Sequence, residues 1–511
     1  MTATTLLLDA TIHTGANPPG AGVATAMAVR DGDIAWVGPT SDGAARFPDA
    51  RRIPLDGALV TPAFVDAHVH ATSAGLQLSG ADLGSARSLA EFLALVASSG
   101  PGPVLGHGWD ETAWPERRPP TRAELDAAVG DRLAYLSRID VHSALVTTAL
   151  AIAVPEAVAE DGWSLDGPVS RAAHHVVRRA ALGGIDPTRR RDAQLAFLRH
   201  AASMGVACVH ECGGPDISAA EDFTELLADD PALPLVIGYW GELTGTEVAA
   251  RLGARGLAGD LFVDGALGSR TAALCEPYLD ADTSGALYLD ADRIAAHVVA
   301  CTRAGIQAGF HVIGDAAVAA VIEGFAGAER QVGTAALVAA RHRLEHLEMV
   351  DAGQAARLGR WGVVASVQPL FDATWGGRDG MYAERLGPDR GAALNPFAHL
   401  AAAGVTLALG SDAPVTPVDP WGAVRAAVHH RTDGFGIGVA DAFTAHTRGG
   451  WLAAGAAADD PVGTLVPGAP ATYAVWDATD GLPDLDPTGE LPRCLRTVRA
   501  GTTIHDSGEL R

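Results

Sequence analysis

From residue 59 onward the chain repeats one pattern, in which a short apolar stretch ends in polar or glycine residues and precedes a stretch of helical character. The pattern occurs in LVTPAFVDAHVH, GVACVHECGG, PLVIGYWGE, DLFVDGALG, GIQAGFHVIGD, RHRLEHLEM, GVVASVQPL and GVTLALGSDAP. Strands that alternate with helices are typical of a parallel sheet. Eight such units predict an α/β fold, a (β/α)8 barrel whose active site lies at the carboxyl ends of the strands.

Three segments lie outside this repeat. The count of eight strands holds only if residues 71–204 form an insertion after the first strand, and the strands and amphipathic helices within it predict a cap or lid. Residues 1–58 and 457–511 share a pattern of short strands with glycine and proline turns. We therefore expect the two ends of the chain to pair into one small β-sheet domain. The barrel itself is expected over residues 59–456.

Composition narrows the class of protein. A formal net charge of -24 argues against nucleic-acid binding, which needs a basic surface, and gives no sign of binding to anionic membranes. The amino terminus lacks a basic leader segment, and no apolar run approaches the ~20 residues of a membrane span. Five scattered cysteines suit reduced thiols in the cytoplasm. We expect a small-molecule substrate as partner, and a homodimer is compatible with the sequence.

Two histidines one residue apart end the first predicted strand. Because side chains alternate along a strand, His68 and His70 point to the same face. Further candidates lie near the ends of three later strands, at His311, His346 and Asp412. Four imidazoles and one carboxylate make a nitrogen-rich set that suits Zn²⁺, with Fe²⁺, Mn²⁺ or Co²⁺ as alternatives. The sequence therefore predicts a divalent metal centre at the barrel mouth.

A metal centre of this kind suggests hydrolysis by a metal-activated water molecule. A metal of this kind lowers the pKa of bound water from ~15.7 to about 7, which produces hydroxide at neutral pH. Asp412 is the carboxylate nearest that water, so we expect it to accept the proton and later to deliver it to a leaving nitrogen. His346 is expected to act with it at the reacting centre. An arginine or histidine at the barrel mouth would stabilise the oxyanion.

Together these stretches resemble the amidohydrolase superfamily, and within it the branch that includes N-substituted formamide deformylase. The resemblance rests on TPAFVDAHVH, GWDETAWPERRPPTRAELD, RIDVHSALV, GVACVHECGG, FVDGALGSRTAAL, GFHVIGDAA, RHRLEHLE, ASVQPLF and ALGSDAPV, which together span nearly the whole chain. It implies a distorted TIM barrel with a composite β-sandwich formed by the two chain ends. It also places metal ligands at His68, His70, His311, His346 and Asp412.

The chain departs from the family pattern at one ligand. All 37 basic residues are arginine, so the carbamylated lysine with which many members bridge two metals cannot form. Asp260 stands where related sequences often have lysine. Two outcomes follow: a single metal, or two metals bridged by a native carboxylate such as Asp260 or Asp264. Aspartate is several bonds shorter than carbamylated lysine, so we favour one metal per chain, with Zn²⁺ as first choice.

Several residues are candidates for substrate binding, and each also has a structural interpretation. Trp109, Asp110 and His142 lie in the insertion and would line the lid, although tryptophan and histidine in apolar surroundings usually belong to a core. Asp264 and Arg270, in FVDGALGSR, would position substrate at the end of the fourth strand. Alternatively, these two residues would form a local ion pair that braces a glycine-rich turn.

Other polar residues have mainly structural interpretations. We expect His342 to be a buried structural histidine or one that orients a ligand, and Asp315 to cap the helix after the fifth strand. Strand alternation lets only one of His210 and Glu211 face the barrel interior. The His429–His430 pair follows a helix and is expected to be solvated.

The predicted function is hydrolysis of a non-peptide carbon–nitrogen bond, in an amide or an N-acyl or N-formyl amine, by a metal-activated water. Ester or lactone hydrolysis and ring deamination use the same kind of site and are alternatives. A barrel that only binds or serves as a scaffold is a third alternative, disfavoured because all five expected ligands are present. The sequence identifies neither the acyl group nor the amine.

Overall fold

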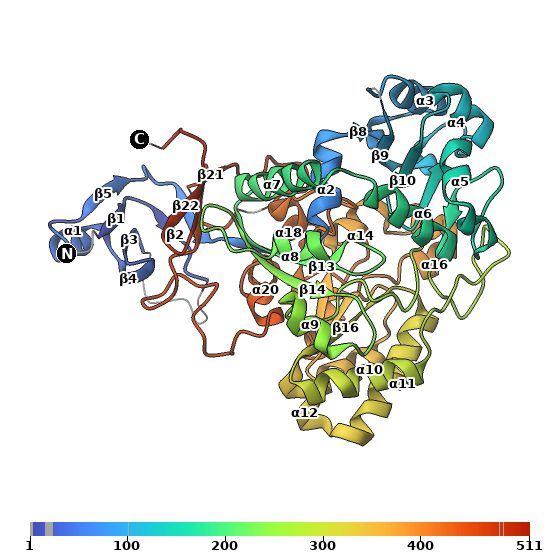
Figure 1. The fold of residues 1–511 in the computed structure, drawn as a ribbon. Coiled ribbons are helices and arrows are strands. Elements are labelled where there is room, and N and C mark those ends of the chain that lie inside the picture. The colour runs from blue at the N-terminus through green and yellow to red at the C-terminus, as the bar shows by residue number, and fades with distance from the viewer. Residues whose placement is uncertain (1–3, 16–23, 101, 480, 484, 511) are drawn as a thin grey trace.

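Figure 1 shows the computed structural model, which describes residues 4–15, 24–100, 102–479, 481–483 and 485–510. The two ends of the chain lie together at the left of the view, and the inserted segment lies at the upper right, with the barrel between them. No helix within the described ranges is long and apolar enough to cross a membrane.

Eight parallel strands form the central sheet, as the repeat predicts. Their order follows the chain: β7 (Phe64–Val69), β13 (Val206–Gly213), β14 (Leu235–Trp240), β15 (Gly256–Leu257), β16 (Gln307–Val312), β17 (Arg343–His346), β18 (Val364–Val367) and β19 (Thr406–Leu409). The sheet closes where Val69 bridges to Ala413 and where the amide of Asp412 donates to the carbonyl oxygen of His68 at 2.8 Å. These contacts make the sheet a barrel and confirm the predicted fold class.

Helices surround the barrel, on its outside and at its mouth. They are α2 (Ala71–Ser79), α7 (Pro187–Ser203), α8 (Ala220–Leu226), α9 (Thr246–Leu252), α10 (Ala291–Ala304), α11 (Asp315–Val332), α12 (Thr334–Ala340), α13 (Ala352–Arg360), α14 (Pro369–Trp375), α15 (Met381–Leu386), α16 (Pro388–Gly391), α17 (Phe397–Ala402), α18 (Pro420–Val428), α19 (Val439–His446) and α20 (Arg448–Ala453). Apolar helix residues such as Val298 and Phe325 belong to one buried cluster with the strand residues Phe310 and Leu344. This core holds the strand ends in fixed positions.

The fourth strand is shorter than predicted. Regular pairing covers only β15, because the chain turns at Gly259, where φ is 76° and an added Cβ would lie 2.9 Å from that of Cys212. Beyond this turn the amide of His311 donates to Leu261 and the amide of Val263 donates to His311, both at 3.0 Å. The predicted segment DLFVDGALG is therefore a distorted part of the barrel wall.

The inserted segment has its own sheet and its own core. Its elements are β8 (Ala81–Asp82), α3 (Leu89–Ala97), β9 (Val104–Trp109), α4 (Arg122–Val129), β10 (Ala134–Arg138), β11 (Ser143–Val146), α5 (Thr148–Ala153), β12 (Val169–Ser170) and α6 (Arg171–Gly183). The ring of His107 donates to the carbonyl oxygen of Pro414 at 3.0 Å, and the hydroxyl of Ser269 donates to Asp140 at 2.6 Å. These contacts place the insertion over the barrel mouth.

Strands from both ends of the chain share one sheet. Its order is β2 (Thr11–Ile12), β6 (Leu59–Pro62), β20 (Tyr473–Trp476), β21 (Cys494–Arg499) and β22 (Thr502–Asp506). A second sheet contains β4 (Asp33–Gly38), β3 (Ala26–Arg30), β1 (Thr5–Leu8) and β5 (Arg51–Pro54), with α1 (Thr40–Arg46) beside it. Residues 59–62, predicted to begin the first barrel strand, belong instead to the composite sheet, because Val60 pairs with Val475 in antiparallel register.

Candidate metal centre

The strand ends bring all five predicted ligands together at the barrel mouth. His68 lies near the end of β7, His311 lies in β16 and His346 ends β17, while His70 follows β7 and Asp412 lies three residues beyond β19. Each of these residues is at most 6 % exposed. Burying so many ionisable groups is costly unless they are paired or bind a metal.

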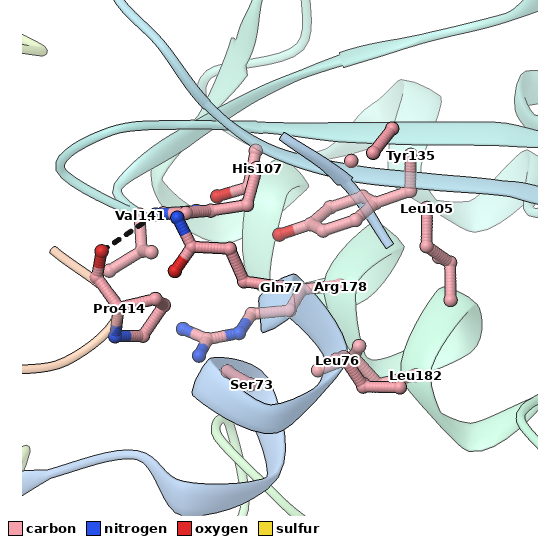
Figure 2. Close-up of a pocket in the computed structure, with 13 residues that line it drawn as sticks. Ser73, Leu76, Gln77, Leu105, His107, Tyr135, Val141, Arg178, Leu182 and Pro414 are labelled. Carbon is pink, nitrogen blue, oxygen red and sulfur yellow. Dashed lines mark hydrogen bonds between the residues drawn. The ribbon is translucent and has the colours of Figure 1, made fainter. Parts of the chain in front are cut away.

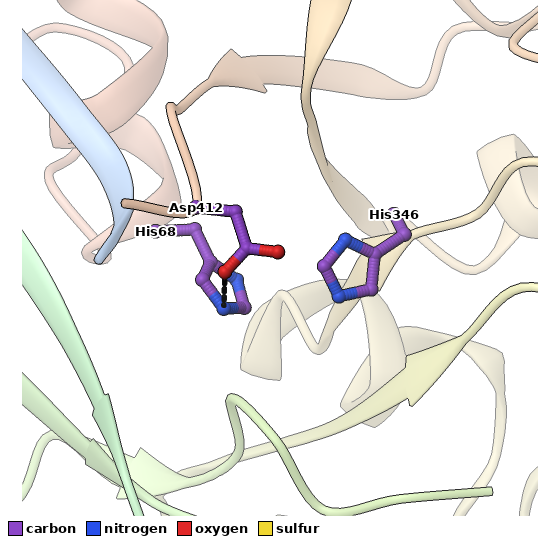
Figure 3. A group of neighbouring side chains, drawn as sticks. All are labelled: His68, His346 and Asp412. Atoms are coloured by element: carbon purple, nitrogen blue, oxygen red, sulfur yellow. Dashed lines mark ion pairs between the residues drawn. The ribbon is translucent and has the colours of Figure 1, made fainter. Parts of the chain in front are cut away.

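Two carboxylates lie among the imidazoles. Oδ1 of Asp412 is 3.4 Å from Nε2 of His68 and 3.2 Å from Nε2 of His70. Figure 3 shows the Asp412 carboxylate facing His68, with the ring of His346 beside them. Asp260 is as close, with oxygens 3.4 Å from Nε2 of His68, 3.2 Å from Nε2 of His70 and 3.9 Å from Nε2 of His346. Asp260 therefore reaches the cluster without the length of a lysine, so its shorter side chain is no reason to expect a single metal.

Several of these buried atoms have no hydrogen-bond partner within the described part of the chain. They include Nε2 of His68, Nδ1 of His311, Oδ1 of Asp260 and Oδ1 of Asp412. Proteins pair nearly all such atoms, so a group of unpartnered nitrogens and oxygens gathered in one place indicates an occupant. Ligand atoms of His68, His70 and Asp260, and those of Asp260, His311 and His346, lie within 4.8 Å of one another. Imidazole and carboxylate donors fit a divalent metal ion.

The carboxylates also set the charge of the imidazoles. Burial acts to lower the pKa of His70, but the nearby carboxylates of Asp260 and Asp412 raise it to about 9. For Asp260, burial acts to raise the pKa, but His68 and the neighbouring imidazoles hold it well below its usual range. The same negative charge that holds protons on these rings favours a divalent cation, whose binding releases those protons.

Ligand orientation depends on residues that the sequence analysis missed. His68 donates its Nδ1 hydrogen to Oε2 of Glu345 at 3.0 Å, and Arg343 donates to the two oxygens of Glu345 at 2.6 and 2.9 Å. His346 donates its Nδ1 hydrogen to Oε1 of Gln368 at 2.8 Å. These bonds leave Nε2 of each ring free for a metal. The available signal was Arg343 and Glu345 within a buried strand, where charged residues are rare unless paired.

The backbone is strained at two of the ligands. His346 and Asp412 have φ angles of 68° and 55°, in the left-handed region that non-glycine residues rarely adopt. Such conformations cluster at functional sites, where the surrounding fold maintains them. At Asp412, the bond from its amide to the carbonyl of His68 helps to maintain the conformation. The fold therefore positions both side chains before any ligand binds.

His142, one of the predicted substrate-binding residues, lies beside the centre. Its ring centroid is 4.9 Å from that of His311, and both residues line a small cavity together with Asp412. Burial lowers the pKa of His142 to about 4, so its imidazole is neutral at pH 7. A neutral imidazole at this place has a nitrogen-bound hydrogen to donate.

Three other substrate-binding candidates make structural contacts instead. Trp109 is 1 % exposed in the core of the insertion, where its indole N–H donates to a backbone carbonyl at 2.8 Å. Asp110 pairs with Arg138 at 2.9 Å, and Arg270 pairs with Asp280 at 2.6 Å. Motif order along the chain could not reveal where these side chains point. The structure does not bring them to the metal centre.

Asp264 braces the distorted fourth strand. Its carboxylate is fully buried and accepts three backbone amide hydrogens at 2.8 to 3.0 Å, including those of Ile313 and Gly314. Its Oδ1 also lies 3.8 Å from Nδ1 of His311. The ion pair with Arg270 that we considered does not form, since Arg270 has another partner. Asp264 thus lies behind His311 and ties the loop after β15 to the end of β16.

Two histidines outside the centre were assigned structural or solvated positions. His342 is buried, accepts the amide hydrogen of Ala308 on Nδ1 at 2.9 Å and lies 2.9 Å from the hydroxyl of Thr302, as expected of a structural histidine. The prediction for His430 was wrong. Its side chain is 1 % exposed and its Nε2 lies 3.5 Å from Asp372, because the chain after α18 folds back onto α14.

Two acidic residues bind backbone amides. Gly314 occupies the N-cap of α11, and Asp315, predicted to be the cap, is the first residue of the helix and accepts a hydrogen bond from the loop after β15 at 2.9 Å. Glu211 accepts the amide hydrogen of Ala71, at the start of α2, at 2.7 Å. Its neighbour His210 instead contacts the buried arginine of β17 at 3.2 Å.

Helix α6 of the insertion approaches the centre, which the sequence analysis did not anticipate. The ring of His175 stacks on Phe262 at 5.4 Å, and Phe262 lies 5.0 Å from His311. Below this helix a cavity of about 370 Å³ has His70 and Trp240 among its walls. The signal was the run HHVVRR, which places two histidines and two arginines on one or two turns of a helix.

A parallel barrel with buried histidines and aspartates at the carboxyl ends of its strands defines a class of metal-dependent hydrolases. The sequence matches the amidohydrolase family over residues 52–505, and the chain belongs to this family.

Individual relatives cover most of the chain. It is 28 % identical to Protein LONG AFTER FAR-RED 3 of Arabidopsis thaliana over 509 residues, which cover 89 % of this chain and 85 % of that protein. It is 27 % identical to the putative amidohydrolase YtcJ of Bacillus subtilis, over 79 % of this chain and 80 % of that protein. The crystal structure of an uncharacterized metal-dependent hydrolase from Pyrococcus furiosus superimposes with a TM-score of 0.72 at 26 % identity, over 93 % and 99 % of the two chains.

Proposed function

We propose that this amidohydrolase hydrolyses a non-peptide carbon–nitrogen bond, in an amide or an N-acyl or N-formyl amine. The observation that carries the proposal is the convergence of unpartnered imidazole nitrogens and carboxylate oxygens at one buried place. A divalent ion held there supplies Lewis-acid polarisation and makes water nucleophilic near neutral pH. The sequence resemblance to N-substituted formamide deformylase supports an N-acyl amine as substrate.

Asp412 is the residue proposed to move the proton. Its Oδ1 has no hydrogen-bond donor among the described residues, so it is available to accept a proton from water and to return it to the leaving nitrogen. A leaving amine needs this proton more than a leaving alkoxide does, because an amide anion is the stronger base. The presence of a carboxylate here therefore favours cleavage of a carbon–nitrogen bond.

His142 is proposed to stabilise the carbonyl oxygen. It lines the same cavity as Asp412 and is neutral at pH 7, so it donates a hydrogen bond without adding a charge that repels the metal. Arg138 lines this cavity as well, but its guanidinium is already paired with Asp110, Glu111 and Asp140 at 2.9 Å each. This network leaves His142 freer than Arg138 to donate a hydrogen bond into the cavity.

Asp260 is proposed as a metal ligand in place of the bridging lysine of related proteins. It belongs to both groups of candidate ligands, one with His68 and His70 and the other with His311 and His346. Its position between these groups allows one carboxylate to serve either a single ion or two. The metal content of the purified protein decides between these arrangements.

An activity panel tests the proposal. Protein stripped with a chelator and reloaded separately with Zn²⁺, Fe²⁺, Mn²⁺ or Co²⁺ is assayed on N-formyl and N-acetyl amines, carboxylic esters, lactones and amino-substituted heterocycles. We expect metal-dependent hydrolysis of the amides that is lost in D412N. Faster turnover of esters or deamination of the heterocycles would reject the amide assignment, and absence of any metal effect would reject the metal centre.

A further inference from the structure

A third cavity lies between the insertion and helix α2. Figure 2 shows its walls, which come from α2, from strands β9 and β10, from α6 and from the loop after β19. Its volume is about 50 Å³, which is enough for a few water molecules or for one small functional group. The polar side chains that face it include Ser73, Gln77, His107 and Arg178.

Arg178 is the only charged residue in the wall of this cavity. It is 5 % exposed, yet its guanidinium forms no hydrogen bond or ion pair with any residue in the described ranges. Figure 2 shows the guanidinium directed into the cavity, toward Gln77 and Pro414. Every other arginine with comparable burial is paired: Arg138 with three carboxylates, Arg343 with Glu345 and Arg385 with Asp280.

The surrounding groups do not neutralise this charge. No acidic residue lines the cavity. Burial lowers the pKa of His107 to about 4, and burial together with nearby cations lowers that of His174 well below its usual range, so both rings are neutral at pH 7. An arginine cannot lose its proton in a protein, so this cavity keeps a full positive charge. A buried cation without a partner is unfavourable, and an anion would relieve it.

Three segments of the cavity wall lie close in sequence to residues of the metal centre. Ser73 lies three residues after His70, Pro414 lies two residues after Asp412, and Val141 directly precedes His142. Ser73, Leu76 and Leu182 line both this cavity and the larger one that contains His70. Arg178 therefore lies in a cavity whose walls border those of the cavity that contains His70.

We propose that Arg178 binds a carboxylate group of the substrate, so that the enzyme acts on amides that carry a carboxylate near the scissile bond. The planar guanidinium offers two parallel N–H donors, which match the two oxygens of a carboxylate. The small volume excludes larger groups. This inference rests on the proposed function, because it names the substrate class of the same metal centre.

A binding measurement tests the subsite without catalysis. Metal-loaded wild-type protein is titrated with butanoate and with butanamide, which has the same shape and no charge, and binding is followed by calorimetry. We expect butanoate to bind and R178Q to weaken this binding about 10- to 100-fold, with R178K intermediate. In R171Q, which removes an arginine of the same helix that pairs with Asp161, the affinity should not change. Equal affinity of butanoate for wild type and R178Q would show that it binds only the metal, and would overturn the proposal.

Stability separates a binding role from a structural one. Because Arg178 pairs with no described residue, R178Q should unfold at a temperature no lower than the wild type. A lower unfolding temperature together with unchanged butanoate binding would identify Arg178 as a structural residue and reject the subsite. If R178Q cannot be purified, the comparison of R178K with wild type gives the same readout.

An activity comparison then gives the substrate class. N-acetyl amino acids and succinamate, which carry the carboxylate on the amine side or on the acyl side, are compared with their uncharged amide counterparts. We expect one charged series to have a lower KM than its uncharged counterparts. In R178Q this difference in KM should shrink at least 10-fold. Hydrolysis of uncharged amides with no Arg178-dependent binding would overturn the subsite and leave the proposed function intact. Arg178-dependent binding without hydrolysis of any amide would support the subsite and overturn the proposed function.

Discussion

Nδ1 of His68, on β7, lies 3.0 Å from Oε2 of Glu345, on β17. Because the carboxylate accepts the Nδ1 hydrogen, the lone pair of His68 is on Nε2, which faces Asp260 and Asp412. Arg343 holds Glu345 in turn with two short bonds. The buried chain from arginine to glutamate to histidine therefore determines which ring nitrogen is presented to the metal.

The first prediction concerns this chain. Replacing Glu345 with glutamine keeps the shape but removes the charge, so we expect metal affinity to fall 10- to 100-fold. Metal affinity is measured by competition with a chromophoric chelator. R360Q, which breaks the exposed pair with Glu329, is the control and should retain the wild-type affinity. An unchanged affinity in E345Q would show that Glu345 serves only the packing of the barrel.

The second prediction concerns Asp412 as proton carrier. In D412N the side chain keeps an oxygen ligand but cannot accept a proton, so we expect kcat on the best amide to fall about 10²- to 10⁴-fold. Metal content is measured in the same preparations, because loss of activity together with loss of metal would show only a ligand role. A kcat within threefold of wild type would contradict the assignment.

The third prediction concerns Asp260. Its carboxylate lies within 3.9 Å of three imidazole nitrogens, so we expect D260A to contain less metal per chain than the wild type. Elemental analysis of protein dialysed against metal-free buffer gives the stoichiometry. D315A changes an aspartate outside the candidate metal centre that accepts backbone amide hydrogens, and it serves as control. Identical metal content in D260A and wild type would exclude Asp260 as a ligand.

The fourth prediction concerns acid stability. Burial, together with the nearby His297, lowers the pKa of His342 from 6.5 to about 3. The neutral ring accepts the amide hydrogen of Ala308 on Nδ1. Between pH 6.5 and 3, His342 is therefore protonated in the unfolded chain and neutral in the folded chain. Above pH 6.5, His342 does not change the unfolding free energy with pH. As the pH drops from 6.5 toward 3, it lowers the unfolding free energy by about 1.4 kcal/mol per pH unit.

Urea titrations at several pH values measure this effect. H342N retains an acceptor for Ala308 but does not titrate, so its unfolding free energy should fall less steeply than that of the wild type as the pH drops from 6.5. H429N changes an exposed histidine and should follow the wild type. Parallel pH profiles for H342N and wild type would rule out His342 as a source of acid sensitivity.

Sequence patterns predicted the barrel and the convergence of ligands because both follow from strand periodicity. His68, His70, His311, His346 and Asp412 each lie at or just beyond a strand end, and parallel strands bring these ends to one face. The shortening of the fourth strand could not be predicted, since it depends on the close approach of Gly259 to Cys212 in the folded barrel.

Side-chain direction was less predictable than position. Trp109 and Arg270 lie in motifs that suggest a pocket, but their partners are a backbone carbonyl and Asp280, which lie in other segments of the fold. Arg178 presents the opposite case, since the run HHVVRR places it on a helix but does not show that its guanidinium has no partner among the described residues. Its significance comes from the missing partner, and pairing of buried charges is visible only in three dimensions.

The composite sheet has a consequence for the order of folding. Strand β6 lies between β2 and β20, which are separated by more than 450 residues along the chain. During synthesis β6 therefore presents an open hydrogen-bonding edge until residues 473–476 have left the ribosome, and this edge directly precedes the strand that carries His68. The nascent protein must keep that edge from pairing with another chain, so slow translation or truncation near the carboxyl end should promote aggregation before it affects catalysis.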